Sequence, residues 1–431
     1  MYLNKYEKSG MFWVPTTYFM EGFPYILIFV VSSIMLKNLG VGNAAITSYT
    51  SLFLFPSLVM PFLSVFLDIY KSNRWWIYMT ELLLALFILL IILALSSSSF
   101  FSITIALFFL LSINSNTHDM SVDGNYVSNL PTERQSFFLG FQSVFVVLGK
   151  FFSQGFLVIL SGIVFSYTHN YFIAWQISLA VAAIVTLCLA IYHFFVLPER
   201  PNSYKKQSAN PLVPKEGIIK RIYLIYKSFF QLEGIWIGLV FIVLYKLGEL
   251  LVSAIFPLFL IDTHVHGGMG LSNASVGFAY GTVVVPFTII AGLLGGFLIY
   301  KKGLKFWLLP MVLIMNIPHG LFIILAHDPN LSYSTVLVFI IIEKFCFTFA
   351  VCAYVIFMMY LIRNSSYKTS HYAFFLGFTT LVQIPIRAVS GYIQELVGYE
   401  WTFIFIFLIV VPLLICVRFI KVDSNYGKKG A

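Results

Sequence analysis

Long apolar runs recur along the whole chain, and short polar segments separate them. Most runs are long enough for a membrane-spanning α-helix, which needs about 20 residues to cross a hydrocarbon layer about 30 Å thick. The pattern predicts an all-α polytopic membrane protein with twelve transmembrane helices. The expected spans cover residues 12–36, 43–67, 75–95, 100–128, 135–161, 171–196, 235–261, 272–300, 304–326, 333–362, 369–395 and 400–420.

The widest interruption of this pattern, residues 197–234, opens with Pro, Ser, Asn and Lys and then becomes amphipathic. It divides the predicted spans six and six. We therefore expect an N-terminal six-helix bundle at 1–196, a cytoplasmic linker with an amphipathic helix at 197–234, and a C-terminal six-helix bundle with a short cytoplasmic tail at 235–431. The pentapeptide FFLGF occurs at 137–141 and again at 374–378. Such internal similarity is typical of transporters built from two repeats.

Small residues four positions apart recur in the predicted spans and allow helix backbones to approach closely. They indicate either contact between the fifth and eighth spans of the two halves or packing within one bundle. The pairs are Gly149/Ser153, Gly277/Gly281 and Gly292/Gly296.

Composition agrees with the pattern, since 60% of the 431 residues are hydrophobic and 10% are charged, against roughly 25% charged in soluble domains. The four cysteines all lie in apolar runs, without metal-type spacing or a disulfide framework. His264 and His266 in the loop DTHVHGG lack a third partner at metal-ligand spacing. We therefore expect neither a metal nor another cofactor.

Basic residues orient the spans, because short loops rich in Lys and Arg stay in the cytoplasm. With the N-terminus inside, most of the 26 basic residues fall in cytoplasmic segments. We therefore expect both termini in the cytoplasm. The net charge of +9 then faces an anionic leaflet and is no indication of nucleic-acid binding.

Ionisable residues inside the spans are the main candidates for function, because a charge at membrane depth costs at least about 3 kcal/mol unless it has a partner or a wet cavity. These residues are Glu21, Glu81, His118, Asp119, Asp123, Lys150, Lys246, Glu249, Glu343, Lys344 and Arg387.

The acidic residues of the first and fourth spans each allow two interpretations. Glu21 precedes Gly22 and Pro24, which favours either an ordinary kink or a broken helix that frees carbonyl groups beside a carboxylate. Asp119 and Asp123 are four residues apart and share a helix face. Two like charges at close range suit proton binding; alternatively, Asp123 ends the helix near the cytoplasmic surface.

In the second half, Lys246 and Glu249 are three residues apart and share a helix face. They either neutralise each other, or separate when Glu249 takes a proton or Lys246 meets an anion. Glu343 and Lys344 are adjacent and point about 100° apart, which favours separate ion pairs. Glu81, near the cytoplasmic end of its span, is expected to bridge to a basic residue of a loop.

The remaining candidates would contact a substrate. Lys150 lies near the centre of its span, where its side chain does not easily reach either surface, and it is therefore expected to pair with an anion or a carboxylate. Arg387 either reaches the outer surface or binds an anion as well. Aromatic rings could stack on a sugar and amides could hydrogen-bond to it. These side chains are Tyr25, Tyr245, Gln142 and Gln383.

Four motifs occur in order along the chain: YFMEGFPY in the first span, FLDIYKSNRWW after the second, THDMSVDGNYV in the fourth and YKLGE in the seventh. Together they resemble the AmpG-type permeases of the major facilitator superfamily, a group similar to the acetyl-coenzyme A transporters of eukaryotic endomembranes. The resemblance covers nearly the whole chain.

This resemblance implies the fold of that superfamily and an importer in the bacterial inner membrane. The substrate would be an anhydro-muropeptide, chiefly N-acetylglucosaminyl-anhydro-N-acetylmuramic acid with or without its peptide. Proton symport would drive the import through alternating access, and we expect a monomer in the bilayer. The alternative is a proton-linked carrier for another amino-sugar, oligosaccharide or acyl-nucleotide anion.

The resemblance also assigns residues. His118 stands at a glutamine-like position of the family's fourth-span segment, and Glu249 stands where the family has an aspartate. We expect proton coupling by Glu21, Asp119, Asp123 and Glu249, and substrate binding by His118, Gln142, Lys150, Lys246, Gln383, Arg387, Tyr25 and Tyr245. The loop residues Asp68, Lys71 and Arg74 form a reduced version of the superfamily's cytoplasmic gate loop.

An integral-membrane enzyme is a different class of protein and is disfavoured. We expect no Ser or Cys nucleophile with a paired base and no set of three metal ligands. A signalling receptor is disfavoured too, because the cytoplasmic segments are too short for an output domain.

Overall fold

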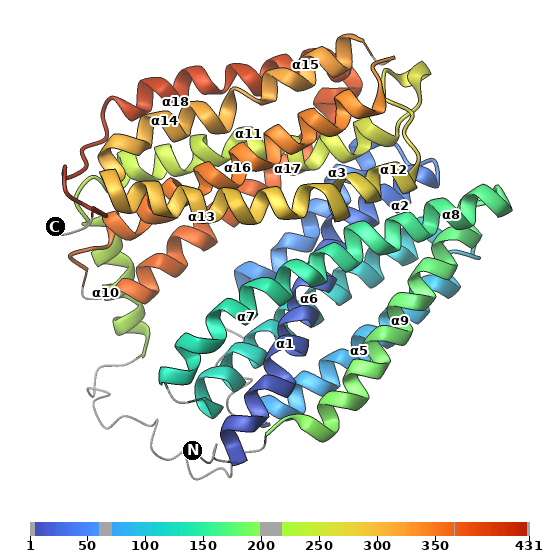
Figure 1. Ribbon diagram of the computed structural model, residues 1–431, viewed down its shortest axis with the longest axis horizontal. Coiled ribbons are helices and arrows are strands. Elements are labelled where there is room, and N and C mark those ends of the chain that lie inside the picture. Colours follow the sequence, from blue (N-terminus) through green and yellow to red (C-terminus); the bar gives the residue numbers. More distant parts are fainter. Residues whose placement is uncertain are drawn as a thin grey trace. The chain divides into compact units, whose positions relative to one another are not determined.

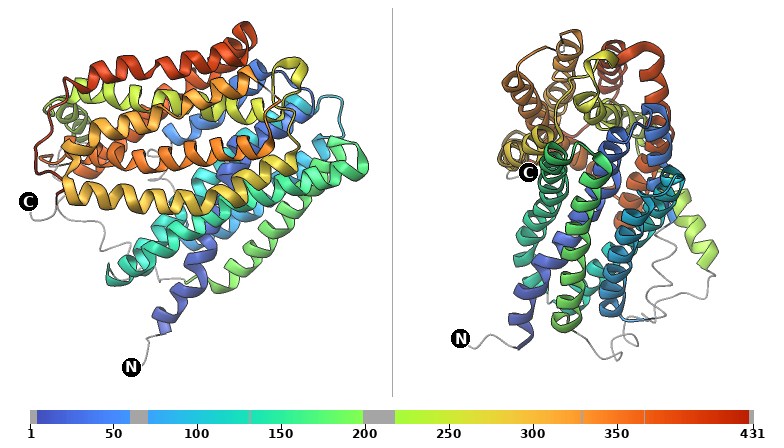
Figure 2. Two further views of the ribbon diagram at one scale, coloured as in Figure 1. Left: turned by 45° about the horizontal axis from the view of Figure 1, so that its top comes forward. Right: turned by 90° about the vertical axis from the view of Figure 1, so that its right-hand side faces the viewer.

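The computed structural model describes residues 5–59, 71–130, 132–198, 218–328, 330–365 and 367–428. Within these ranges every regular element is a helix, as the ribbons of Figure 1 and Figure 2 show. The chain forms two compact units. The first holds residues 1–208 and 271–282, and the second holds residues 209–270 and 283–431.

The first unit contains the elements of the predicted spans one to six and the start of span eight. Its α-helices are α1 Lys5–Ile26, α2 Ser32–Asn38, α3 Asn43–Ser51, α5 Asn73–Ala94, α6 Phe100–Asn129, α7 Thr132–Phe151, α8 Val158–Thr168, α9 Tyr171–Val196 and α12 Asn273–Phe278. Tighter or wider turns join some of them: the π-helices η1 Leu27–Val31 and η3 Phe152–Leu157, the 3₁₀ turn η2 Leu52–Leu54, and the π-helix η6 Ala279–Val283, which leads out of α12.

The second unit contains the remaining elements. They are α10 Ile218–Phe230, α11 Ile235–Ile261, the 3₁₀ turn η5 His264–His266, α13 Val284–Lys302, α14 Leu304–Asn316, α15 His319–His327, α16 Tyr333–Leu361, α17 Lys368–Leu408 and α18 Val410–Val417. The short helix α10 lies within the segment 197–234 that was expected to hold an amphipathic helix, and it packs against α11 and α17.

Ten helical stretches of the described residues are long and apolar enough to cross a membrane. One of them, Ser370–Val417, covers the two last predicted spans. Gly398 separates those spans, because its φ of 79° interrupts the helix in a conformation that favours glycine. The predicted span 43–67 is not among the ten, since residues 60–70 lie outside the described part. The other predicted spans are all found among these stretches.

Of the two interpretations of the first span, an ordinary kink or a broken helix, the structure excludes the broken helix. Pro24 does not break the helix: α1 continues to Ile26, and the π-helix η1 and then α2 follow without interruption. Proline removes one backbone donor and clashes with the preceding turn, and a π-helical turn is a common way to absorb such a change of register. The span therefore changes to a wider, π-helical turn at Leu27, six residues beyond Glu21.

Glycines decide how closely α1 and α7 approach each other. A Cβ on Gly22 would overlap the carbonyl of Val146, and a Cβ on Gly149 would overlap the carbonyl of Phe19. Ser153 donates a hydrogen bond to the carbonyl oxygen of Phe23 at 2.6 Å. The Gly149/Ser153 pair therefore packs within the first unit, against the first span, and α1 runs beside α7 in Figure 1.

The eighth span approaches the fifth through other small residues. A Cβ on Gly281 would overlap Gly155 Cα, and one on Gly277 would lie 2.8 Å from the backbone nitrogen of Ile159. In α13 the close contact is made by Gly295, which faces Phe349 of α16, and not by the predicted Gly292/Gly296 pair.

Replacing Gly149 by alanine is expected to lower the free energy of unfolding by about 1–3 kcal/mol, because the added methyl group meets backbone atoms that cannot rotate away. Thermal unfolding of the purified protein in detergent would measure this. Gly296→Ala is the matched control, since nothing lies within 4 Å of its Cβ position and alanine favours the helix. Equal melting temperatures for the two variants would contradict the packing argument.

The repeated pentapeptide has the same role in both units. It lies in α7 and in α17, and its second phenylalanine is buried in each copy, with Phe138 2% and Phe375 0% exposed. Phe138 joins a core with Trp13 and Tyr126, whereas Phe375 joins the core of the second unit. The two copies therefore anchor corresponding helices.

Candidate functional site

A buried carboxylate between two histidines is the most polar feature of the first unit. Glu81 of α5 is fully buried, and its Oε1 lies 2.7 Å from His193 Nδ1 of α9 and 3.1 Å from His118 Nε2 of α6. The other ring nitrogen of His193 lies 2.8 Å from the Thr16 hydroxyl of α1. The prediction that Glu81 bridges to a loop base is therefore wrong, because the packing of α5 against α6 and α9 gives it two imidazoles.

The same chain of hydrogen bonds continues to Asp119. His118 Nδ1 lies 3.3 Å from Asp119 Oδ1, and the side chain of Asp119 is 31% exposed. His118 is itself 2% exposed and has both ring nitrogens occupied. His118 therefore lies inside this network and not on a substrate-binding surface, which corrects its predicted role.

We call these five residues the buried relay: Thr16, His193, Glu81, His118 and Asp119. Each link joins groups that can donate or accept a proton. An ionised Glu81 accepts an N–H from Nδ1 of His193 and from Nε2 of His118, which fixes the tautomer of each neutral ring. Nδ1 of His118 then accepts a hydrogen bond from a protonated Asp119, or donates one to an ionised Asp119 when the ring is protonated. The relay thus connects a fully buried carboxylate to an accessible one.

Two further carboxylates lie near the relay in sequence but have other surroundings. Asp123 is exposed and accepts a hydrogen bond from the Tyr18 hydroxyl at 2.9 Å. It does not end its helix, because α6 continues to Asn129. Glu21 is half-buried, and its Oε2 is buried without a hydrogen-bond partner. Asp119 and Asp123 therefore have different partners, although they share a helix face.

The predicted substrate residues of the first unit lie at more open positions. Lys150 and Tyr25 are both exposed, and Lys150 Nζ lies 5.6 Å from the centroid of the Tyr25 ring, which is cation–π distance. Gln142 of α7 is half-buried. An exposed ammonium beside an aromatic face can bind both an anion and a sugar ring.

The gate residues are described in part. Asp68 lies outside the described residues. Lys71 is exposed with its Nζ 5.7 Å from the Trp75 ring, and Arg74 donates a hydrogen bond to the carbonyl oxygen of Phe194 at 2.6 Å. Arg74 thus connects the start of α5 with the end of α9.

In the second unit, Lys246 and Glu249 form no ion pair with each other, so the first of their two interpretations, mutual neutralisation, is wrong. Glu249 Oε1 lies 3.2 Å from the Nζ of Lys344, and the same Nζ lies 3.2 Å from Glu343 Oε2. Lys246 Nζ instead lies over two rings, 4.6 Å from that of Phe347 and 5.5 Å from that of Tyr354. The adjacent Glu343 and Lys344 therefore belong to one cluster and not to separate pairs.

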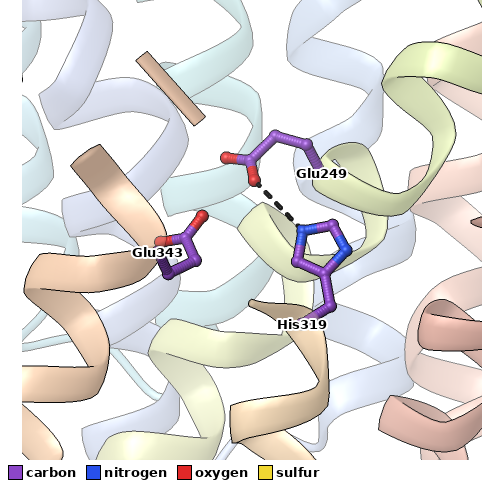
Figure 3. A group of neighbouring side chains, drawn as sticks. All are labelled: Glu249, His319 and Glu343. Atoms are coloured by element: carbon purple, nitrogen blue, oxygen red, sulfur yellow. Dashed lines mark ion pairs between the residues drawn. The ribbon is translucent and has the colours of Figure 1, made fainter. Parts of the chain in front are cut away.

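His319 completes this cluster, although it was not among the candidate residues predicted from the sequence. Its Nε2 lies 3.8 Å from Glu249 Oε2, and Figure 3 shows the side chains of His319, Glu249 and Glu343 gathered around one point. The available signal was a Pro–His pair in the middle of a predicted span. His193 was missed as well, although any histidine within a span is an intramembrane ionisable residue.

Two predicted substrate residues of the second unit are buried. Tyr245 is 0% exposed and donates a hydrogen bond to the carbonyl oxygen of Ala350 at 2.7 Å. Its ring belongs to the core, which corrects its predicted stacking on a sugar. Arg387 is 5% exposed and so does not reach the outer surface, whereas Gln383, one turn earlier in α17, is half-buried.

Lys150 and Arg387 occupy equivalent positions in the two units. The interval in sequence between them is the same as that between the two FFLGF copies, and they lie in the same helices as those copies, α7 and α17. A basic residue is therefore present at the same place in both repeats.

Comparison with known proteins identifies this architecture. Residues 16–384 match the sequence model of the Major Facilitator Superfamily. The chain belongs to this superfamily. The resemblance to its AmpG-type permeases, inferred above from four motifs, is confirmed by two relatives. A Rickettsia conorii protein that carries the name AmpG 4 is 25% identical over 94% of this chain and 95% of its own. The anhydromuropeptide permease of Escherichia coli K12 is 24% identical over 93% of this chain and 77% of its own.

A solved structure shows the same fold. The nucleoside transporter NupG matches with a TM-score of 0.69 at 15% identity, over 96% of this chain and 98% of that one. The superfamily member described here is accordingly a multi-pass membrane transporter with a small-molecule substrate, and not an enzyme.

Proposed function

We propose that this transporter imports anhydro-muropeptides in symport with protons, by alternating access. The substrate would be N-acetylglucosaminyl-anhydro-N-acetylmuramic acid with or without its peptide. The observation that carries the coupling is the buried relay, because it links a fully buried glutamate to the partly exposed Asp119. The substrate class rests on the relatives named AmpG 4 and anhydromuropeptide permease.

Protons would bind at carboxylates that differ in access. Asp119 would exchange its proton with water and with His118, and Asp123 and Glu21 would supply further binding positions in the first unit. Glu249 is the proposed proton carrier of the second unit, with Lys344 as its partner. Protonation of a carboxylate removes a charge from membrane depth. Because a buried charge is costly, the neutral site would switch more readily between access from one side of the membrane and access from the other.

The muramyl carboxylate would bind to basic residues within each unit. Lys150 is exposed beside Tyr25 in the first unit. In the second, Lys246 forms no ion pair with any described carboxylate and lies against aromatic rings. Gln142 and Gln383 would hydrogen-bond to the sugars. Arg387 already interacts with other groups of the protein, and these interactions would keep its side chain in place. His118 and Tyr245 are left out of the proposed substrate site because both are buried.

The proposed setting is the bacterial inner membrane, with a monomer whose two termini are cytoplasmic. Import from the periplasm then follows the inward proton gradient. Uptake into proteoliposomes tests the proposal directly. The labelled disaccharide should accumulate unchanged under an imposed proton gradient, and it should leave the vesicles when an uncoupler dissipates that gradient. Accumulation of another amino-sugar, oligosaccharide or acyl-nucleotide anion in its place would favour the alternative carrier.

Replacing Lys150 by glutamine is expected to raise the KM for the disaccharide about tenfold, because a charge-assisted hydrogen bond contributes roughly 1.5–3 kcal/mol. A substrate whose muramyl carboxylate is converted to an amide should show the same KM with both proteins. Lys305→Gln, an exposed lysine at the start of α14, is the control. An unchanged KM for the acid in the Lys150 variant would remove this residue from the site.

A further inference from the structure

We propose that Glu249, His319 and Glu343 of the second unit form a binding site for a divalent transition-metal cation. The three side chains come from α11, α15 and α16, and they are 6%, 1% and 1% exposed. One ligand atom from each lies within 4.8 Å of the others. The inference does not depend on the proposed function, since binding of the metal alone can be measured.

The separation between Glu249 and His319 suits an ion better than a hydrogen bond. Glu249 Oε2 and His319 Nε2 are 3.8 Å apart (Figure 3), which is too long for a hydrogen bond. Zinc binds nitrogen and oxygen at about 2.1 Å, so two ligands of one tetrahedral ion lie about 3.4 Å apart. Closing the Glu249–His319 distance by about 0.4 Å would therefore let both atoms coordinate one ion, and an oxygen of Glu343, within 4.8 Å of both, would reach it after a side-chain shift of about 1 Å.

Several buried polar atoms around this point have no hydrogen-bond partner. They are Glu249 Oε2, both ring nitrogens of His319 and Asn316 Oδ1, whereas Glu343 Oε2 has the Lys344 ammonium at 3.2 Å. Buried polar groups are satisfied in the great majority of cases, and unsatisfied ones gathered around one point indicate a missing ligand. A cation bound by the three residues would satisfy Glu249 Oε2 and one nitrogen of His319, and it would share Glu343 with Lys344.

The local backbone explains how these side chains converge. Pro318 lacks a backbone donor, and the ninth span is interrupted there: α14 ends at Asn316 and α15 begins at His319. Gly248 leaves the necessary space, because a Cβ there would lie 3.0 Å from His319 Cε1 and 3.3 Å from Asn316 Oδ1.

Lys344 would let a bound cation exchange, because its ammonium competes with the cation for a carboxylate. Its Nζ already supplies one positive charge to Glu249 Oε1 and to Glu343 Oε2, so an incoming cation competes with it at Glu343. On Glu249 the two cations use different oxygens, because Lys344 contacts Oε1 and His319 faces Oε2. Lys344 therefore orients one ligand and weakens another.

The ligand chemistry selects the type of cation. An imidazole nitrogen with carboxylate oxygens suits Zn²⁺, Mn²⁺ and related ions, whereas Mg²⁺ and Ca²⁺ prefer oxygen ligands alone. We therefore expect Zn²⁺ to bind more tightly than Mn²⁺, and Mg²⁺ to compete poorly with either.

The test is metal binding by the purified full chain in detergent after removal of metals with a chelator. Titration calorimetry with Zn²⁺ and electron paramagnetic resonance with Mn²⁺ should both report one site per chain. His319→Gln and Glu343→Gln should each weaken Zn²⁺ binding by roughly tenfold or more. Lys344→Met should instead tighten it, because the competing charge is gone.

His371→Gln is the matched control, since His371 is buried in the same unit but lies between Ser228 and Ser365, without a carboxylate partner among the interactions described. It should bind Zn²⁺ like the unaltered protein. Size-exclusion elution identifies any variant that fails to fold, and Glu343→Gln then stands in for His319→Gln. Absence of Zn²⁺ binding by the unaltered chain, or equal weakening by Lys344→Met and His319→Gln, would overturn the proposal.

Discussion

Replacing Asp119 by asparagine is expected to abolish accumulation of the disaccharide while exchange down its own gradient continues. An asparagine resembles the protonated acid in shape, but it cannot take up or release a proton. With one proton carried per monoanion, a gradient of one pH unit supports about tenfold accumulation. The variant should therefore reach no more than equal concentrations on both sides, measured with labelled substrate in proteoliposomes.

Asp328→Asn is the control for this prediction, because Asp328 is exposed beyond the end of α15. It should accumulate substrate as the unaltered transporter does. Full accumulation by the Asp119 variant would remove this residue from proton coupling. Failure of the unaltered transporter to take up the disaccharide would instead disprove the substrate assignment.

Replacing Glu81 by alanine is expected to lower the free energy of unfolding by about 3–5 kcal/mol, because removal of one partner leaves the other groups of a buried polar cluster uncompensated. His118 and His193 would both lose their shared acceptor at positions 2% and 0% exposed. Chemical unfolding in detergent, followed by tryptophan fluorescence, would measure the loss. Glu81→Gln should cost less, since an amide can still hydrogen-bond to both rings.

The matched control is Glu233→Ala. Glu233 is 89% exposed and lies 3.7 Å from Arg363, and such an exposed pair contributes about 0–1 kcal/mol. A Glu81→Ala variant as stable as this control would show that the relay does not hold α5, α6 and α9 together.

Helix positions and the fold class were predictable because the constraint on them is local. A chain segment in hydrocarbon must satisfy its own backbone hydrogen bonds, so an apolar run of about 20 residues can only be a helix. The Pro24 region shows the limit of such reasoning. A proline weakens a helix in every context, but whether the span breaks or widens into a π-helical turn depends on the neighbours that support it.

The candidate residues were also found largely from sequence, since an ionisable group at membrane depth is conspicuous. Their partners were not. Lys246 and Glu249 share a helix face, yet Glu249 pairs with Lys344, which lies far away in sequence on α16. Spacing along one helix says which side chains can meet, and helix packing decides which of them do.

The sequence by itself predicted a membrane transporter with many spanning helices, and it located the costly charges of its spans. Only the tertiary structure decided that His193 joins Glu81, that His319 joins Glu249 and Glu343, and that Tyr245 belongs to the core. The physical reason is the difference in range. Hydrophobicity and backbone hydrogen bonding act over a single helical segment, whereas a buried charge is satisfied by whichever helices pack against it.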